Sequence, residues 1–276
     1  MTTMKKLTRA LLAAGLLGGA SLGNVAHAGA VFNFNTANIP GSTTAFSFNA
    51  DEITITSVGL AQIAITDTDG NGILDGSFGD TFAETGLVSA LNFQLNNLNI
   101  FGTGINDSYE LLAVYSLGGV AGVVGTDLKA IMTLGAATIW YDETPNNAVG
   151  PGAINIGTLA IPPGGGDCVV TAATSFTEGS CKMTFDFAAV GPGIWTVPGV
   201  GDLAGNLTDS MTLDININNS VPPVAPVFPG GPGSVQNIEV DHDGSAVINV
   251  PEPGTLALLG GALLGLGFLR RRGGSD

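Results

Sequence analysis

The chain has 276 residues, of which 45% are hydrophobic and 11% charged, and its formal net charge is −15 at pH 7. Six of the eight basic residues lie near the two ends, so residues 29–250 hold two lysines against 21 acids, a net charge of −19. So acidic a surface repels phosphate backbones, which excludes nucleic acid as a partner, and it attracts cations. The high apolar content and the scattered acids exclude a disordered acidic tail.

The chain begins with a predicted secretory signal peptide over residues 1–28. Basic residues precede an uncharged run of small and apolar residues, and Ala26-His27-Ala28 has the small-x-small form of a cleavage site. The short apolar run favours cleavage after Ala28 over an uncleaved anchor. We therefore expect export through the inner membrane.

Alternation of apolar and polar residues dominates residues 29–219. It is clearest in Ile53–Thr56, Met183–Phe187 and Met211–Ile217. Such alternation is typical of half-buried strands in antiparallel sheets. Further predicted strands, separated by Gly, Asn, Asp and Pro clusters, are Ala45–Asn49, Leu60–Thr66, Leu87–Phe93, Tyr109–Leu117, Leu128–Leu134, Ala136–Tyr141 and Ile154–Ile161. The sequence predicts an all-β extracellular domain, an antiparallel β-sandwich-like body, with hydrophobic helices only at the termini.

The segment DTDGNGILD carries the one motif of the body that points to a ligand. Its oxygen-bearing side chains are Asp67, Asp69, Asn71 and Asp75. They converge if the loop curls, and Gly72 permits the sharp turn that calcium loops need. The alternative is a solvated turn between strands.

The same segment resembles the calcium loops of EF-hands, dockerins and thrombospondin type 3 repeats. The resemblance implies calcium held by these four side chains and by the carbonyl oxygen of Ile73. The twelfth position, where such loops place a bidentate acid, is Phe78, with Asp80 and Glu84 as candidates to supply the missing oxygen. The implied site is weak, with a dissociation constant of order 10⁻⁴ to 10⁻³ M.

Other residues give little support for catalysis. Cys168 and Cys181 are the only cysteines, and outside the cell we expect them to form one disulfide that closes a short loop. His242 is the only histidine after signal cleavage, which disfavours serine or cysteine hydrolase chemistry and zinc. Because no carboxylate pair is marked for glycoside hydrolysis, we expect that the protein is not an enzyme.

A spacer follows the main domain. Residues 220–233 hold five prolines, which cannot pair in a central strand, so the domain is predicted to end near Asn219. Beyond the spacer, residues 234–249 are predicted to form a small hairpin, because Asp241–Gly244 reads as a turn between two apolar runs.

The last 27 residues, 250–276, have three parts: Pro251-Glu252-Pro253, an uncharged run from Thr255 to Leu269, and Arg270-Arg271-Arg272. As a helix the run would be roughly 22 Å long, short for a hydrocarbon core of about 30 Å. The arginines would stay on the cytoplasmic side and stop export. An ordinary C-terminal membrane anchor is the alternative.

These three parts in this order resemble a PEP-CTERM sorting signal. The resemblance implies a transient span of the inner membrane, recognition by an exosortase, and removal of the tail near Pro251-Glu252-Pro253. The body would then be released or attached to the cell surface, among extracellular polysaccharide.

A second likeness involves the body. Residues 79–97 and 108–119 are similar to flocculation-associated PEP-CTERM proteins, which implies a role in cell aggregation within a polysaccharide matrix, as in flocculation or biofilm formation. We expect an exported structural or adhesive protein of the cell surface or matrix. The alternatives are a carbohydrate-active enzyme displayed by the same route and a simple anchored membrane protein.

Overall fold

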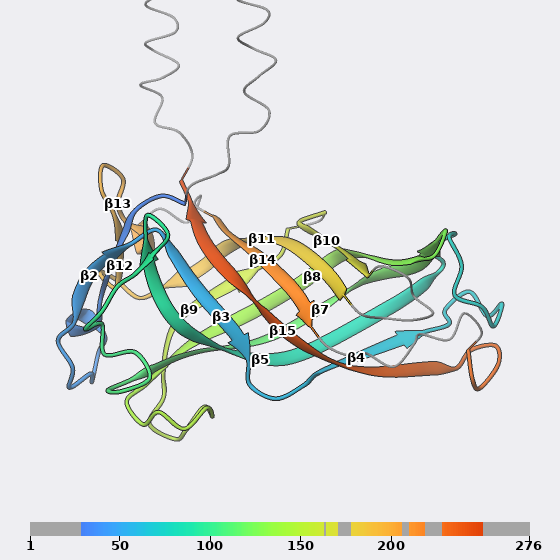
Figure 1. Ribbon diagram of the computed structural model, residues 1–276, viewed down its shortest axis with the longest axis horizontal. Helices are drawn as coiled ribbons and strands as arrows, with labels where there is room; N and C mark the ends of the chain where they lie inside the picture. The colour runs from blue at the N-terminus through green and yellow to red at the C-terminus, as the bar shows by residue number, and fades with distance from the viewer. Residues whose placement is uncertain (1–28, 163, 171–177, 206–209, 219–227, 251–276) are drawn as a thin grey trace, which may run out of the picture.

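The computed structural model describes residues 29–162, 164–170, 178–205, 210–218 and 228–250. Most of these residues lie in antiparallel strands, which confirms the predicted all-β, sandwich-like body (Figure 1). The helical segments within these ranges are two short 3-10 turns, η2 (Thr36–Asn38) and η3 (Leu203–Gly205). No helix among the described residues is long and apolar enough to cross a membrane. The two predicted terminal helices lie outside the described residues.

Most strands belong to one large antiparallel sheet. Its members are β3 (Glu52–Ser57), β4 (Ala61–Thr66), β5 (Asp80–Leu95), β6 (Leu98–Asn99), β7 (Glu110–Val124), β8 (Asp127–Asp142), β9 (Ile154–Ala160), β10 (Gly166–Val170), β11 (Glu178–Val190), β14 (Ser210–Asn218) and β15 (Val235–Asn249). Two predicted strands, Leu128–Leu134 and Ala136–Tyr141, are parts of the single strand β8. The long strands let one sheet curl around a shared interior.

The hydrogen-bonded order of this sheet returns to its starting point. Strand β11 pairs with β14 on one side and with β9 and β10 on the other, and both of these also pair with β8. From β8 the order continues through β7 and β5 to β3 and β4, then through β15 back to β14. The two layers of the sandwich-like body are thus the two sides of one closed, flattened sheet with an apolar interior.

A small sheet lies at one end of the elongated body (Figure 1). It consists of β1 (Phe32–Asn35), β2 (Ser47–Ala50), β12 (Trp195–Val197) and β13 (Gly201–Asp202). Phe34 stacks on Phe93 of β5 at a centroid distance of 5.5 Å and lies 4.6 Å from Trp195. All three side chains are essentially unexposed, so an aromatic cluster joins the small sheet to the closed sheet.

The segment beyond the proline-rich spacer is not a hairpin, which corrects the prediction for residues 234–249. It forms one continuous strand, β15, between β14 on one side and β3 and β4 on the other. Gly244 lies in the strand, paired with Ile215 of β14, and a Cβ there would come within 2.1 Å of the carbonyl oxygen of Asp214. The glycine lets β14 approach closely. Residues 219–227 of the spacer lie outside the described residues, and Phe228 is buried in the core.

The two ends of the described body lie side by side. The backbone N–H of Ala30 donates to the carbonyl oxygen of Ile248 at 2.8 Å. The first described residues and the end of β15 therefore lie next to each other on the body (Figure 1).

Candidate functional site

Residues 67–79, the acidic loop, connect β4 to β5 at the end of the body away from the small sheet (Figure 1). Its glycines have backbone conformations that other residues rarely adopt, with φ of +71° at Gly70 and +77° at Gly72. A Cβ on Gly72 would also press against Pro232 at 3.2 Å. The two glycines thus allow the curl that the sequence predicted.

Asp67 organises the loop. Its carboxylate is buried and accepts the N–H groups of Gly70 at 3.0 Å, Gly72 at 2.9 Å and Gly233 at 2.7 Å. Burial alone would raise the pKa of Asp67, but the three backbone donors outweigh it and lower that pKa. The bond from Gly233 also fastens the end of the spacer to the loop.

Three carboxylates meet at this loop. Asp67, Asp69 and Asp80 each offer one oxygen, and these oxygens lie within 4.8 Å of one another. The pKa of Asp80 is raised by burial and by the negative charges of Asp69, Asp67 and Asp75, although the N–H of Thr68 donates to it at 3.2 Å. A cation would relieve this repulsion.

The structure gathers the predicted ligands only in part. Asp75 does not belong to the group of three and instead accepts the N–H of Ser77 at 2.8 Å. The side-chain oxygen of Asn71 accepts the N–H of Ile73 at 2.7 Å, and its amide donates to Asp69 at 3.0 Å. Asp80, two residues after Phe78, joins the carboxylates, whereas Glu84 lies farther along β5 and faces the interior.

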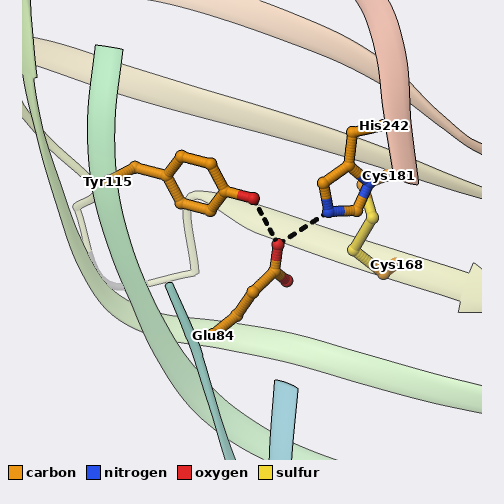
Figure 2. Close-up of a disulfide and its surroundings, with 5 residues drawn as sticks. All are labelled: Glu84, Tyr115, Cys168, Cys181 and His242. Carbon is orange, nitrogen blue, oxygen red and sulfur yellow. Dashed lines mark hydrogen bonds and ion pairs between the residues drawn. A yellow bond between two sulfur atoms is a disulfide. The ribbon is translucent and has the colours of Figure 1, made fainter. Parts of the chain in front are cut away.

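Glu84 belongs to a polar cluster inside the closed sheet that sequence reasoning missed. One of its oxygens, Oε1, accepts the hydroxyl of Tyr115 at 2.8 Å and lies 2.7 Å from Nε2 of His242 (Figure 2). Glu84 and His242 are only 5% and 3% exposed. Burial and the neighbouring charge of Glu84 raise the pKa of Tyr115, so its hydroxyl remains a donor. If residues 235–249 are taken as one strand, side chains at every second position share a face. His242 would then be expected to face the interior together with Ile238 and Val240.

The cluster borders two cavities in the interior. The larger, of about 80 Å³, is lined mainly by apolar side chains together with Glu84, Tyr115 and His242. The smaller, of about 40 Å³, also touches Glu84. The predicted disulfide is present: Cys168 and Cys181 face each other across β10 and β11, and each borders one of the cavities (Figure 2).

The outer face of the same sheet carries a groove of about 740 Å³ that crosses β10, β11, β14, β15 and β3. Its polar side chains lie in register, with Asp167 opposite Lys182, Lys182 opposite Asp214, and Asp214 opposite Ser245. Lys182 is exposed and forms no ion pair with the residues that the structure describes. The groove thus offers both hydrogen-bond donors and acceptors.

Fold and sites together define an acidic, disulfide-bonded all-β body with a polar groove outside and a polar cluster inside. Residues 249–272 match the PEP-CTERM protein-sorting motif, so the chain is a protein that carries the PEP-CTERM sorting signal. The motif implies exosortase as the processing partner and a cell-surface or extracellular destination. Pro251-Glu252-Pro253 and Arg270-Arg271-Arg272 lie outside the described residues. No curated protein and no solved structure matches the chain.

Proposed function

We propose that this chain is a structural or adhesive protein of the cell surface or exopolysaccharide matrix, released to that place by exosortase. The observation that carries the proposal is the sorting motif at residues 249–272. The adjacent ends of the body support it. Because Ala30 pairs with Ile248, a signal peptide and a C-terminal tail can both reach one membrane while the body stays folded.

The outer groove supports association with polysaccharide. Sugar hydroxyls both donate and accept hydrogen bonds, and the groove presents acceptors at Asp167 and Asp214 beside the donor Lys182. It is open and crosses several strands, which suits a chain-like ligand rather than a small molecule. By this proposal the body helps cells to flocculate or to build a biofilm.

A binding assay with the exopolysaccharide of the host tests this surface. Lys182→Met should weaken binding about tenfold, whereas Lys129→Met, which makes the same charge change outside the groove lining, should leave it within twofold. Equal effects of the two variants would argue against the groove, and no binding by the parent protein would argue against the polysaccharide role itself.

Calcium is the second part of the proposal. The three oxygens within 4.8 Å and the raised pKa of Asp80 support a weak site at Asp67, Asp69 and Asp80, which would stiffen the loop or bridge the body to acidic polymer. At 10 mM calcium a site with a dissociation constant near 1 mM would add about 1.4 kcal/mol to the free energy of unfolding.

Thermal melts with calcium and with chelator measure this difference. Asp69→Ala should abolish the difference, because it removes a ligand without removing the hydrogen bonds that Asp67 accepts. Asp107→Ala, which changes an exposed acid of another loop, should retain it. Identical melts of the parent protein with calcium and with chelator would end the calcium proposal.

By this proposal the protein has no catalytic role. Two of the aromatic side chains that could stack on sugars are buried, with Trp195 1% exposed and Tyr141 unexposed, whereas Trp140 is half-buried. If the protein is instead an anchored membrane protein, its tail stays intact. Mass spectrometry of the C-terminus from surface, medium and inner-membrane fractions separates the two: an end near Pro251-Glu252-Pro253 supports sorting, and an intact arginine cluster supports an anchor.

A further inference from the structure

The two most exposed large apolar side chains of the described residues lie on one hairpin. Phe101 is 92% exposed and Leu98 is 71% exposed. They follow the two-residue turn between β5 and β6, at Asn96 and Asn97, whose φ angles of +54° and +62° suit a tight hairpin turn. We call residues 94–106 the uncharged hairpin. Exposed apolar side chains that are grouped in this way are typical of contact surfaces.

The charge of the uncharged hairpin differs from that of the rest of the body. Residues 94–106 contain no Asp, Glu, Lys or Arg, whereas residues 29–250 as a whole hold 21 acids. The negative surface of a bilayer with anionic lipids repels carboxylates. A segment that exposes apolar side chains and no carboxylate is therefore the part of this acidic body best suited to contact lipid.

The uncharged hairpin lies beside the two described ends of the body. A Cβ on Gly29 would come within 2.4 Å of the carbonyl oxygen of Asp51 and 2.8 Å of Val247, near the end of β15. Asp51 donates its backbone N–H to the carbonyl oxygen of Gln94 at 2.9 Å. Its carboxylate accepts the N–H of Asn96 at 2.8 Å. Direct contacts therefore connect the hairpin to the place where the chain continues into the sorting motif.

The distance from this place to the apolar part of the tail is short. Strand β15 ends at Asn249, and the uncharged run of the tail starts at Thr255. These six residue steps span at most about 22 Å, at roughly 3.6 Å each. While the tail is held in a membrane, the body stays within that distance of the lipid, and the hairpin is among the parts of the body nearest to it.

Hydrogen bonds fix the segment that carries Phe101. On one side of Phe101, the N–H of Ile100 donates to the carbonyl oxygen of Phe93 at 2.9 Å. On the other side, the amide of Asn106 donates to the carbonyl oxygen of Ala90 at 3.1 Å. The segment is thus tied to β5 at both ends, and a contact surface that is already ordered loses little conformational entropy on binding.

We propose that Leu98 and Phe101 insert into the headgroup region of the membrane beside the uncleaved tail, so that the body rests on the lipid in one orientation until exosortase acts. This inference rests on the proposed function, because it needs a tail that is held in the membrane. Two apolar side chains alone bind a bilayer weakly, but the tail makes their contact intramolecular and raises its effective concentration. Removal of the tail therefore also weakens the lipid contact and helps to free the body.

Fluorescence quenching by brominated lipid tests this contact on the full chain. The protein from a host without exosortase is reconstituted in phosphatidylcholine vesicles whose acyl chains are either plain or brominated near the headgroup. Phe101→Trp should lose about half of the emission that the new indole adds, because its ring lies among the lipids. Val235→Trp is the matched control, an exposed apolar position at the other end of β15, and it should lose less than a tenth. The parent protein gives the background emission.

A second pair of variants locates the contact. Adding Leu98→Asp to Phe101→Trp should reduce the quenching at least threefold, because a carboxylate resists transfer from water into lipid. Leu134→Asp changes a side chain that is 61% exposed on β8, and it should leave the quenching unchanged. Thermal melts that agree among these variants show that the fold is intact.

Two results would overturn the proposal, and they differ in what they mean for the proposed function. In the first, the full chain floats with the vesicles but Phe101→Trp is quenched no more than Val235→Trp. The tail then holds the protein, the sorting role stands, and the hairpin contacts exosortase or a second copy of the chain instead of lipid. In the second, the full chain does not float with the vesicles, and the inference fails together with a membrane-held tail.

Discussion

Several carboxylates in this acidic protein are held by backbone and hydroxyl donors without a basic side chain. Glu143 shows this at the small-sheet end. It accepts the hydroxyl of Thr43 and the hydroxyl of Ser42 at 2.8 Å, and the backbone N–H of Thr43 as well. Partial burial alone would raise its pKa, but these donors and Tyr141 lower it from 4.5 to about 2. The negative charge of Glu143 is thus a fixed part of the fold.

The lowered pKa of Glu143 makes an acid-stability prediction. A carboxyl group with a depressed folded-state pKa stabilises the fold above its unfolded value and loses that contribution as the pH falls. The stabilisation should therefore disappear between pH 4.5 and about pH 2. Glu143→Gln should lower the free energy of unfolding at pH 7 by roughly 1–3 kcal/mol and flatten its fall with acid. Urea titrations at several pH values measure both, and Asp107→Asn should follow the parent protein.

A second residue-scale prediction concerns Gly119 in β7. A Cβ at this position would come within 1.9 Å of the carbonyl oxygen of Ile131 in β8, so neither strand could stay in place. Gly119→Ala should reduce the free energy of unfolding by about 3 kcal/mol or prevent folding. Gly152→Ala, where a Cβ would meet nothing within 4 Å, should be tolerated. Equal stability of the two variants in urea would contradict the close approach.

At the scale of elements, alternation was a reliable guide where a strand has one buried face. Met211–Ile217 lies within β14 and Ile53–Thr56 within β3, as the pattern predicts. The prediction failed for β15, because Asp241–Gly244 has the composition of a turn. Gly244 lets β14 and β15 pack closely. The local residue pattern around a glycine is the same whether the glycine allows close packing or a turn. Because His242 was assigned to the turn, its position inside the closed sheet was not predicted either.

Which strands pair with one another could not be predicted from the sequence, for a different reason. Strand β15 pairs with β3 and β4, roughly two hundred residues earlier in the chain, and β11 pairs with strands on both sides of the body. Such contacts depend on the shape of the whole closed sheet. At the acidic loop, Asp67 and Asp69 could be predicted as ligands from the sequence. Asp80 lies beside them because β5 begins at that residue, which the sequence pattern does not show.

The disulfide acts at the same scale, because it fixes β10 against β11. It joins cysteines 13 residues apart in the sequence. Closing a loop of this length in the unfolded chain is worth about 3 kcal/mol. The double variant Cys168→Ala, Cys181→Ala should lose that amount in urea unfolding, and reducing agent should do the same to the parent but nothing to the variant. If neither the double variant nor reducing agent changes the free energy of unfolding, the disulfide does not stabilise the body.

The whole molecule combines a strongly charged exterior with a matched sorting motif at residues 249–272 and a predicted signal peptide at residues 1–28. With a net charge of −19 over residues 29–250, neighbouring bodies repel one another at low ionic strength. Divalent cations or a polysaccharide that engages the groove would offset this repulsion. Under the proposed function, the protein is thus expected to remain dispersed during export and to associate only where such partners are present.

The body should be complete before its tail is removed. Strand β15 ends at Asn249, two residues before Pro251 of the sorting motif. The last residues of β15 are already paired, with β14 on one side and with Ala30 at Ile248. Every described strand of the closed sheet therefore lies before Pro251. In a host that lacks exosortase, the protein should accumulate in the membrane fraction with its disulfide formed. Its melting temperature should lie within about 2 °C of that of the processed form, a shift that corresponds to less than about 1 kcal/mol for a body of this size. A much lower melting temperature, or reduced cysteines in the unprocessed form, would mean that folding follows cleavage and that the tail restrains the body until exosortase acts.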